Sequence, residues 1–210
     1  MARNPRKAAF CRILSATLTA HGFEEGDGGR AWWLRSELGD YIAVNVQSSN
    51  NSANVVYVNI AVVPKPQLEY NRWLARRLWP DNEAAAHQGP DPSIGYLSER
   101  VNPVDAPDTR PWDHALHTVE LARHIGALVA RDLADPIVPR FRRYLDRDML
   151  LSTLDRMGAM AGVARWLRAA FLAETGDVED ADRVYGPADE DDENQARQRQ
   201  FLREYALAHQ

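Results

Sequence analysis

Amide, aromatic and guanidinium side chains recur at every second position in four apolar segments of this chain. In residues 44–62, valines alternate first with Asn45 and Gln47, and then with Tyr57 and Asn59. Such alternation is typical of a strand with one apolar and one polar face. The segments "RAWWLRSEL" and "SIGYLSERV" continue the pattern. If the apolar sets pack on a helix, the opposite face collects Trp33, Arg35, Asn45, Gln47, Tyr57, Asn59, Tyr96 and Arg100.

These eight residues, the predicted polar sheet face, combine chemistry suited to recognition. Aromatic side chains supply contact area at a low entropy cost, and arginines supply directional hydrogen-bond donors. We therefore predict that this face binds another protein. Two alternatives stay open: the C-terminal helices cover the face as ordinary packing, or Arg35 and Arg100 hold an anionic small molecule in a binding or enzymatic domain.

A second candidate binding element is the acidic segment 177–193, "DVEDADRVYGPADEDDE", with nine acidic residues and one basic residue. The remaining residues hold 24 basic side chains (25 less one) and 21 acidic side chains (30 less nine). An acidic segment on a mildly basic body is suited to docking a basic protein partner. The net charge of the whole chain is −5, so nucleic acid is not favoured. RNA binding through arginines and aromatics stays the lower alternative.

Known catalytic and cofactor motifs are missing from the sequence. No nucleophile elbow, Walker loop or dinucleotide-binding fingerprint occurs. The glycine-rich "GDGGR" (residues 26–30) lies between a predicted helix and a predicted strand, which is the wrong order for a phosphate loop. Cys11 is the single cysteine, which excludes an intrachain disulfide and a cysteine-based zinc site. We predict no catalytic residue and no cofactor.

Three histidines and a glutamate, His114, His117, Glu120 and His124, fall on one stripe of a predicted helix. Apolar residues share that stripe and the spacing is not that of a known metal motif, so we interpret it as the edge of a core-facing surface and predict no metal site.

The hydropathy pattern predicts an α+β fold with an N-terminal helix at 5–20 and a small antiparallel sheet of about four strands. A helix follows in "QLEYNRWLARRLW", then a loop from Pro80 to Ser93. Helices dominate from "WDHALHTVELARHIGALVARDL" onward, with a helical hairpin turned at Gly176-Asp177. We predict an α+β domain at 5–140 and a helical C-terminal extension at 141–210.

Apolar stretches are too short to cross a bilayer, and Arg12 interrupts the N-terminal apolar stretch, unlike a secretory signal. We therefore expect a cytoplasmic protein without membrane contact.

The order of several short motifs resembles one known family. A helix ending in "HGF", then "WWLRSE", "VNVQSS", "YVNIAV", Arg100 and "RPWD" is similar to the domain-of-unknown-function family numbered 4304, over roughly residues 5–140. The resemblance implies helices around a small antiparallel sheet, and it implies no established activity. Small α+β proteins of this kind resemble bacterial immunity or accessory proteins, which bind a partner. We predict a non-enzymatic, immunity-like binding protein.

Overall fold

The computed structural model describes residues 4–102, 114–187 and 192–210. The chain divides into two compact units: Met1–Val63 with Gly89–Leu145, and Pro64–Gln88 with Asp146–Gln210. The fold class is α+β, as predicted. The division differs from the predicted boundary at residue 140, because residues 64–88 belong to the second unit. The predicted start of a helix at Trp112 and the segment "RPWD" lie outside the described residues.

The first unit begins with helix α1, Pro5–Ala20, which confirms the helix predicted over 5–20. The Asn4 side chain accepts hydrogen bonds from the backbone N–H groups of Arg6 and Lys7, two groups that a helix start leaves without partners. Pro5 fits this first turn because its fixed φ already suits a helix. One face of α1 is buried through Phe10, Cys11, Leu14 and Leu18.

An antiparallel sheet of six strands follows within the described part of the unit. The order is β1-β2-β3-β4-β5, and β6 also pairs with β4. The strands are β1 (Glu24–Glu25), β2 (Ala31–Arg35), β3 (Tyr41–Ser48), β4 (Val55–Val63), β5 (Tyr96–Arg100) and β6 (His114–Ala115). The four predicted strands are confirmed. β1 and β6 have two residues each, too few to show a period in the sequence.

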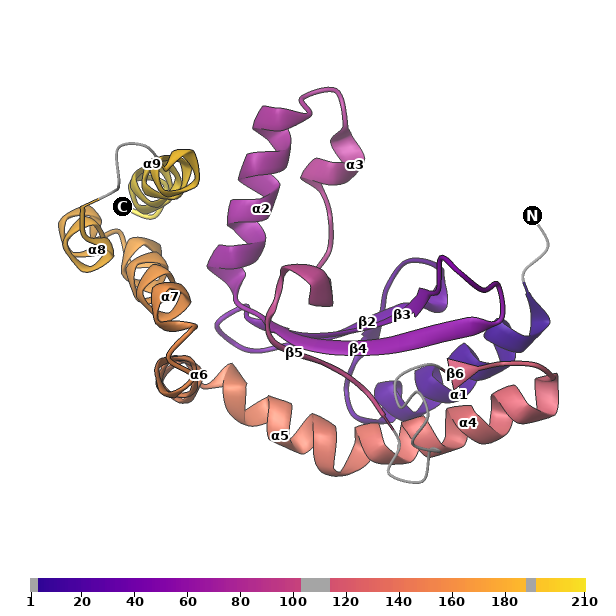
Figure 1. The fold of residues 1–210 in the computed structure, drawn as a ribbon. Helices are drawn as coiled ribbons and strands as arrows, with labels where there is room; N and C mark the ends of the chain where they lie inside the picture. The colour runs from indigo at the N-terminus through magenta and orange to yellow at the C-terminus, as the bar shows by residue number, and fades with distance from the viewer. Residues whose placement is uncertain (1–3, 103–113, 188–191) are drawn as a thin grey trace. The chain divides into compact units, whose positions relative to one another are not determined.

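Valine and isoleucine side chains form the apolar sheet face, with Val44 opposite Ile60 and Val46 opposite Val58. Helices α1 and α4 (Val119–Asp132) lie together along this face, as Figure 1 shows. Phe10 of α1 is fully buried and lies beside Gly126 of α4. The unit ends with the helical turns η3 (Leu133–Ile137), α5 (Val138–Arg142) and η4 (Arg143–Leu145).

The second unit is helical in its described residues. It contains α2 (Lys65–Leu78), α3 (Glu83–Ala86), α6 (Arg147–Arg156), α7 (Ala161–Glu174), α8 (Val178–Tyr185) and α9 (Glu193–Leu207). The helical hairpin predicted at Gly176-Asp177 is confirmed by α7 and α8. The short helix α3 lies in the stretch predicted as a loop.

Aromatic side chains from three helices form the core of the second unit. Tyr70 and Trp73 of α2 meet Trp166 of α7 and Phe201 of α9, with ring centroids 5.3 to 6.0 Å apart. Three of these pairs are edge-to-face, and such pairs stabilise a fold beyond the area they bury. No helix in the described part of the chain combines the length and the apolar character needed to span a bilayer.

Replacing Phe10 with alanine should destabilise the first unit by about 3–5 kcal/mol, because it removes a fully buried ring and leaves a cavity. Hydrogen exchange of the α1 and β4 amides would measure the loss. Leu38→Ala is the control, since Leu38 is 57% exposed at a turn and should change stability by less than about 0.5 kcal/mol. Equal effects of the two substitutions would contradict this account of the core.

Lowering the pH should weaken the second unit through Glu204. Burial favours the neutral form, but hydrogen bonds from Trp73 and Gln200 and the charge of Arg77 outweigh it, so the pKa of Glu204 lies below its ordinary value of 4.5. A carboxylate with a lowered pKa stabilises the fold above its unfolded pKa, and this contribution disappears as the pH falls through the folded pKa.

The contribution should be under about 1 kcal/mol, because the Glu204 side chain is 43% exposed. Glu204→Gln should therefore be less stable than the wild type at neutral pH and should approach it in acid. Unfolding in urea at several pH values, with hydrogen exchange of the α9 amides as the readout, would test this. A difference in stability between the two proteins that stays the same at all pH values would contradict it.

Candidate functional site

The β3–β4 register places the amides of the polar sheet face side by side. Asn45 lies directly opposite Asn59, and Gln47 lies opposite Tyr57. Directly paired residues share a face, so their side chains meet. Asn59 Nδ2 donates to Asn45 Oδ1 at 2.8 Å and to Gln47 Oε1 at 3.4 Å. The three amides therefore form one connected ladder.

A loop of the same unit forms one wall beside this ladder. Asn45 Nδ2 donates to Asp91 Oδ2 at 2.9 Å. Asp91 also begins the turn η2 (Pro92–Ile94), because its Oδ1 accepts from the Ser93 backbone N–H at 2.8 Å. At the end of the turn, Gly95 lies so close to Ala61 that a Cβ on it would come within 2.7 Å of the Ala61 Cβ. Small residues thus let the loop lie directly on the sheet.

An arginine closes the other side of the ladder. Arg100 is paired with Asn59 across β4 and β5, and its guanidinium lies 4.4 Å from the centre of the Tyr57 ring. This cation–π contact holds the head of a long side chain over the sheet. The ladder, the loop and Arg100 enclose an open groove of about 460 Å³, which we call the amide groove. Its lining includes Asn45, Gln47, Asn59, Asp91, Ser93 and Arg100.

Several groups in the amide groove keep hydrogen-bonding capacity toward a ligand. Within the described part of the chain, the Gln47 amide donors, the Asn59 carbonyl oxygen and the Arg100 guanidinium have no hydrogen-bond partner. The two carboxylates at the groove are occupied: both Asp91 oxygens accept hydrogen bonds, and Glu99 pairs with Arg140. The arrangement can therefore donate to and accept from a polar ligand, while its acids hold the protein together.

The structure brings four of the eight predicted residues into the groove: Asn45, Gln47, Asn59 and Arg100. Tyr57 lies under Arg100, and its hydroxyl donates to Ser49 Oγ at 3.4 Å. The other three residues, Trp33, Arg35 and Tyr96, lie outside its lining.

Trp33 is half-buried by its own unit. Its ring lies against Gly26, where an added Cβ would come within 2.1 Å of a ring carbon, and close to Gly89. Its indole Nε1 donates to Glu24 at 3.2 Å. Trp33 therefore anchors two loops at the edge of the sheet.

Arg35 and Arg100 lie at opposite corners of the sheet. Arg35 is in register with Tyr41 and Val63, whereas Arg100 is in register with Asn59. Three strand spacings and four residues along a strand place their Cα atoms roughly 20 Å apart. The Arg35 guanidinium lies over Tyr41 and that of Arg100 over Tyr57, so the structure does not favour the alternative that both hold one small anion.

The position predicted for Tyr96 is wrong. The β5 register shifts between Ile60 and Val62, and Tyr96 pairs with Val62, which belongs to the apolar face. Leu97, with a φ of 53°, is the extra residue of this bulge. A bulge of one residue reverses the alternation, and the sequence pattern gave no sign of it.

Sequence reasoning missed the groove residues that a loop supplies, since Asp91 and Ser93 come from "GPDPS". Ser98 follows the polar alternation of its strand and also lines the groove, although it is not among the eight predicted residues. An aspartate before Pro-Ser is typical of a capped turn. That signal could have located the turn, although it could not place the turn on this sheet face.

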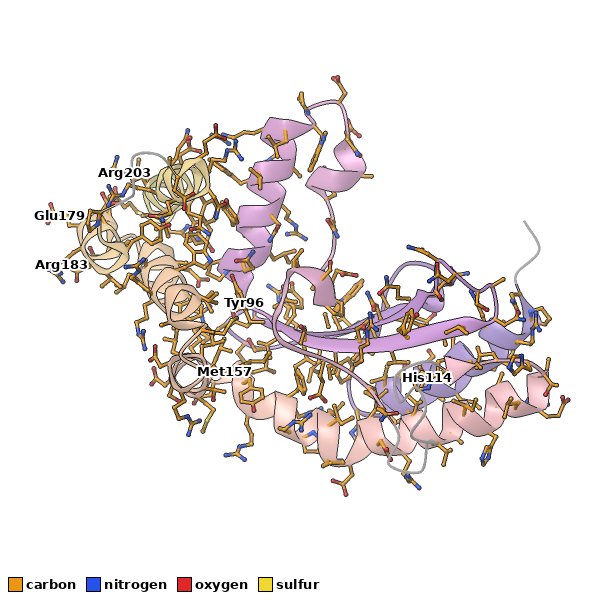
Figure 2. The ribbon with its side chains drawn as sticks, in the orientation of Figure 1. Tyr96, His114, Met157, Glu179, Arg183 and Arg203 are labelled. Carbon is orange, nitrogen blue, oxygen red and sulfur yellow. The ribbon has the colours of Figure 1, made fainter. Side chains whose placement is uncertain are left out.

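The four residues of the predicted histidine stripe do not share a helix. His114 belongs to β6, is buried, and its Nε2 lies 3.1 Å from the Val101 carbonyl oxygen. Figure 2 shows it between the sheet and the helices. Helix α4 begins only at Val119, because the Thr118 hydroxyl caps it. No group of three or more His, Cys, Asp or Glu side chains within the described residues is placed to hold a metal ion.

Acidic residues of the segment 177–193 mostly stabilise the second unit. Asp177 and Asp192 cap the first turns of α8 and α9. Asp180 pairs with Arg183, Asp182 with Arg203 and Glu193 with Arg197. Glu179 projects outward from α8 (Figure 2) and is exposed. Residues 188–191 of the segment lie outside the described residues.

The chain was compared with protein-family models, with curated proteins and with solved structures, and none of them matches it. The resemblance to the domain-of-unknown-function family 4304 therefore stays a prediction.

Replacing Gly95 with alanine should disturb the amide groove. The new Cβ would lie 2.7 Å from the Val62 carbonyl oxygen as well as from Ala61, so the loop must move away from the sheet. We expect a loss of about 1–3 kcal/mol in the first unit and a changed NMR signal of the Asn45 side-chain amide. Gly162→Ala in α7 is the control, because nothing lies within 4 Å of its added Cβ. An undisturbed Asn45 signal in Gly95→Ala would contradict the described wall.

Proposed function

We propose that this protein is a non-enzymatic, immunity-like binding protein of the bacterial cytoplasm, and that it holds an extended polar segment of a partner protein in the amide groove. The observation that carries the proposal is the Asn45–Asn59–Gln47 ladder beside Arg100. An extended peptide presents alternating carbonyl acceptors and amide donors, which the open groups of Gln47, Asn59 and Arg100 complement.

The size and charge of the groove agree with such a ligand. Its volume of about 460 Å³ lies within the range of about 300–1,000 Å³ common for ligand sites. The lining holds Arg100 and two carboxylates, Asp91 and Glu99, and Glu99 is itself paired with Arg140, so the groove has no large excess of either sign. This balance favours a polar segment that presents a carbonyl or a carboxylate to Arg100 over a polyanion.

Binding is favoured over catalysis because the acids at the groove are committed to internal contacts. A general base must lie within hydrogen-bond reach of a substrate proton, and internal donors compete with the substrate for a carboxylate. Asp91 uses both oxygens for Asn45 and the Ser93 backbone. The acidic segment is the less favoured docking element, since most of its described acids cap helices or pair with arginines.

Arg100→Ala and Gln47→Ala should each weaken capture of the partner by about tenfold or more, because each removes an open donor from the groove. The measurement is a pull-down of the tagged full-length chain from lysate of its source organism, with quantitative mass spectrometry, followed by titration of the captured protein. Arg35→Ala is the matched control: an exposed arginine on the same sheet face, beside Tyr41 and outside the groove.

A stoichiometric partner that is lost with both groove variants and kept with Arg35→Ala is the expected result. A partner that all three variants retain would rule out the groove. A partner lost only with Glu179→Gln would move the binding surface to α8, and no stoichiometric partner would contradict the proposal as a whole.

A further inference from the structure

A second hollow of the first unit lies between α1 and the turn that carries "GDGGR". It has a volume of about 230 Å³ and opens to the surface. Lys7 and Arg12 both line it from α1. Arg30 lines it from the turn. We call this hollow the basic pocket.

The turn keeps the pocket open because it uses glycine. Gly28 and Gly29 have φ values of 68° and 65°, a region that other residues rarely adopt. A Cβ on Gly29 would lie 3.0 Å from Glu25 Oε1. Residues with side chains would therefore strain the turn. With glycine at these positions, the turn passes beside α1 and leaves the pocket between the turn and the helix.

Three cations face this space with little internal compensation. Arg12 and Arg30 form no ion pair within the part of the chain that the structure describes. Lys7 Nζ donates one hydrogen bond, to Ser48 Oγ at 2.7 Å, and keeps two donors. The one carboxylate of the lining, Glu25, accepts a hydrogen bond from the Ser15 hydroxyl.

The electrostatics of Lys7 reflect this crowding. Partial burial lowers the pKa of its ammonium group, and the positive charge of Arg30 lowers that pKa further. An anion between the two groups would remove the repulsion.

We propose that the basic pocket binds the phosphate group of a small phosphomonoester. A phosphate has enough oxygens for all three cations, whereas a carboxylate has two, and the guanidinium fork matches phosphate oxygens in pairs. The pocket is half the volume of the amide groove, which suits a single phosphate group. The cations are confined to one small pocket, and the net charge of the chain is −5. A nucleic-acid backbone is therefore not the favoured source of the phosphate group.

Phosphate binding would give the glycine-rich turn a function that its position between a helix and a strand does not suggest. "GDGGR" does not lead into a long helix, so it lacks the order of a phosphate loop. In the structure it instead lies across the side of a helix that contributes the other two cations. The site is thus built from two segments, one from α1 and one from the turn.

Calorimetric titration of the full-length protein with inorganic phosphate, and then with glycerol 3-phosphate, tests the site. We expect saturable binding with a Kd on the order of 1 mM. Arg30→Gln and Lys7→Gln should each weaken binding by about tenfold or more. Arg123→Gln, which removes one exposed positive charge on α4, should stay within about twofold of the wild type.

Arg100→Ala should leave phosphate affinity unchanged, because Arg100 lies in the amide groove. The proposals for the two sites can therefore be tested independently of one another. Lack of saturation at about 50 mM phosphate, or equal weakening by Arg123→Gln and Arg30→Gln, would overturn the proposal. Binding of single-stranded RNA without binding of either phosphate probe would overturn it as well.

NMR titration of Lys7 gives an independent readout. Saturating phosphate should raise the pKa of the Lys7 ammonium group, since the bound anion favours its charged form. An unchanged Lys7 pKa at saturation would show that the anion binds elsewhere and would overturn the assignment.

Discussion

The pairing of β3 with β4 is the constraint on which the first unit depends. Val44 lies opposite Ile60 on the face that α1 and α4 cover, which forces the next pair, Asn45 and Asn59, onto the other face. A slip of one residue would bury amides among valines and expose valines to water. The same register that gives the unit its core therefore also assembles the amide ladder. Core and candidate site are two consequences of one alignment.

Hydrogen bonds among the amides add geometric definition to that alignment. Each bond contributes only about 0.5–1.5 kcal/mol of net stability, but a connected ladder has few alternative arrangements. Asn45 joins the ladder to the loop, because it accepts from Asn59 and donates to Asp91. The contact between Gly95 and Ala61 sets how closely the loop approaches the sheet. Sheet and loop thereby define a groove whose polar groups are already oriented before any partner arrives.

Charge has different roles in the two units. In the second unit, arginines neutralise the acidic residues of α8 and α9, and aspartates cap both helices. A segment that looks like a polyanion in the sequence is therefore, in its described part, largely compensated within the fold. In the first unit, Arg12, Arg30 and Arg100 have no carboxylate partner within the described residues. We expect an external ligand to be recognised at such charges, which the fold holds in place without neutralising them.

The sequence by itself determined the α+β class, the helix over 5–20, the four main strands and the face shared by Asn45, Gln47 and Asn59, because these follow from local periodicity and capping. Tertiary structure decided what periodicity cannot encode. A bulge at Leu97 moved Tyr96 out of phase, the strand order separated Arg35 from Arg100, and a distant loop supplied Asp91. Contacts between segments far apart in the chain decide these positions, since strand order and loop placement depend on how whole elements pack.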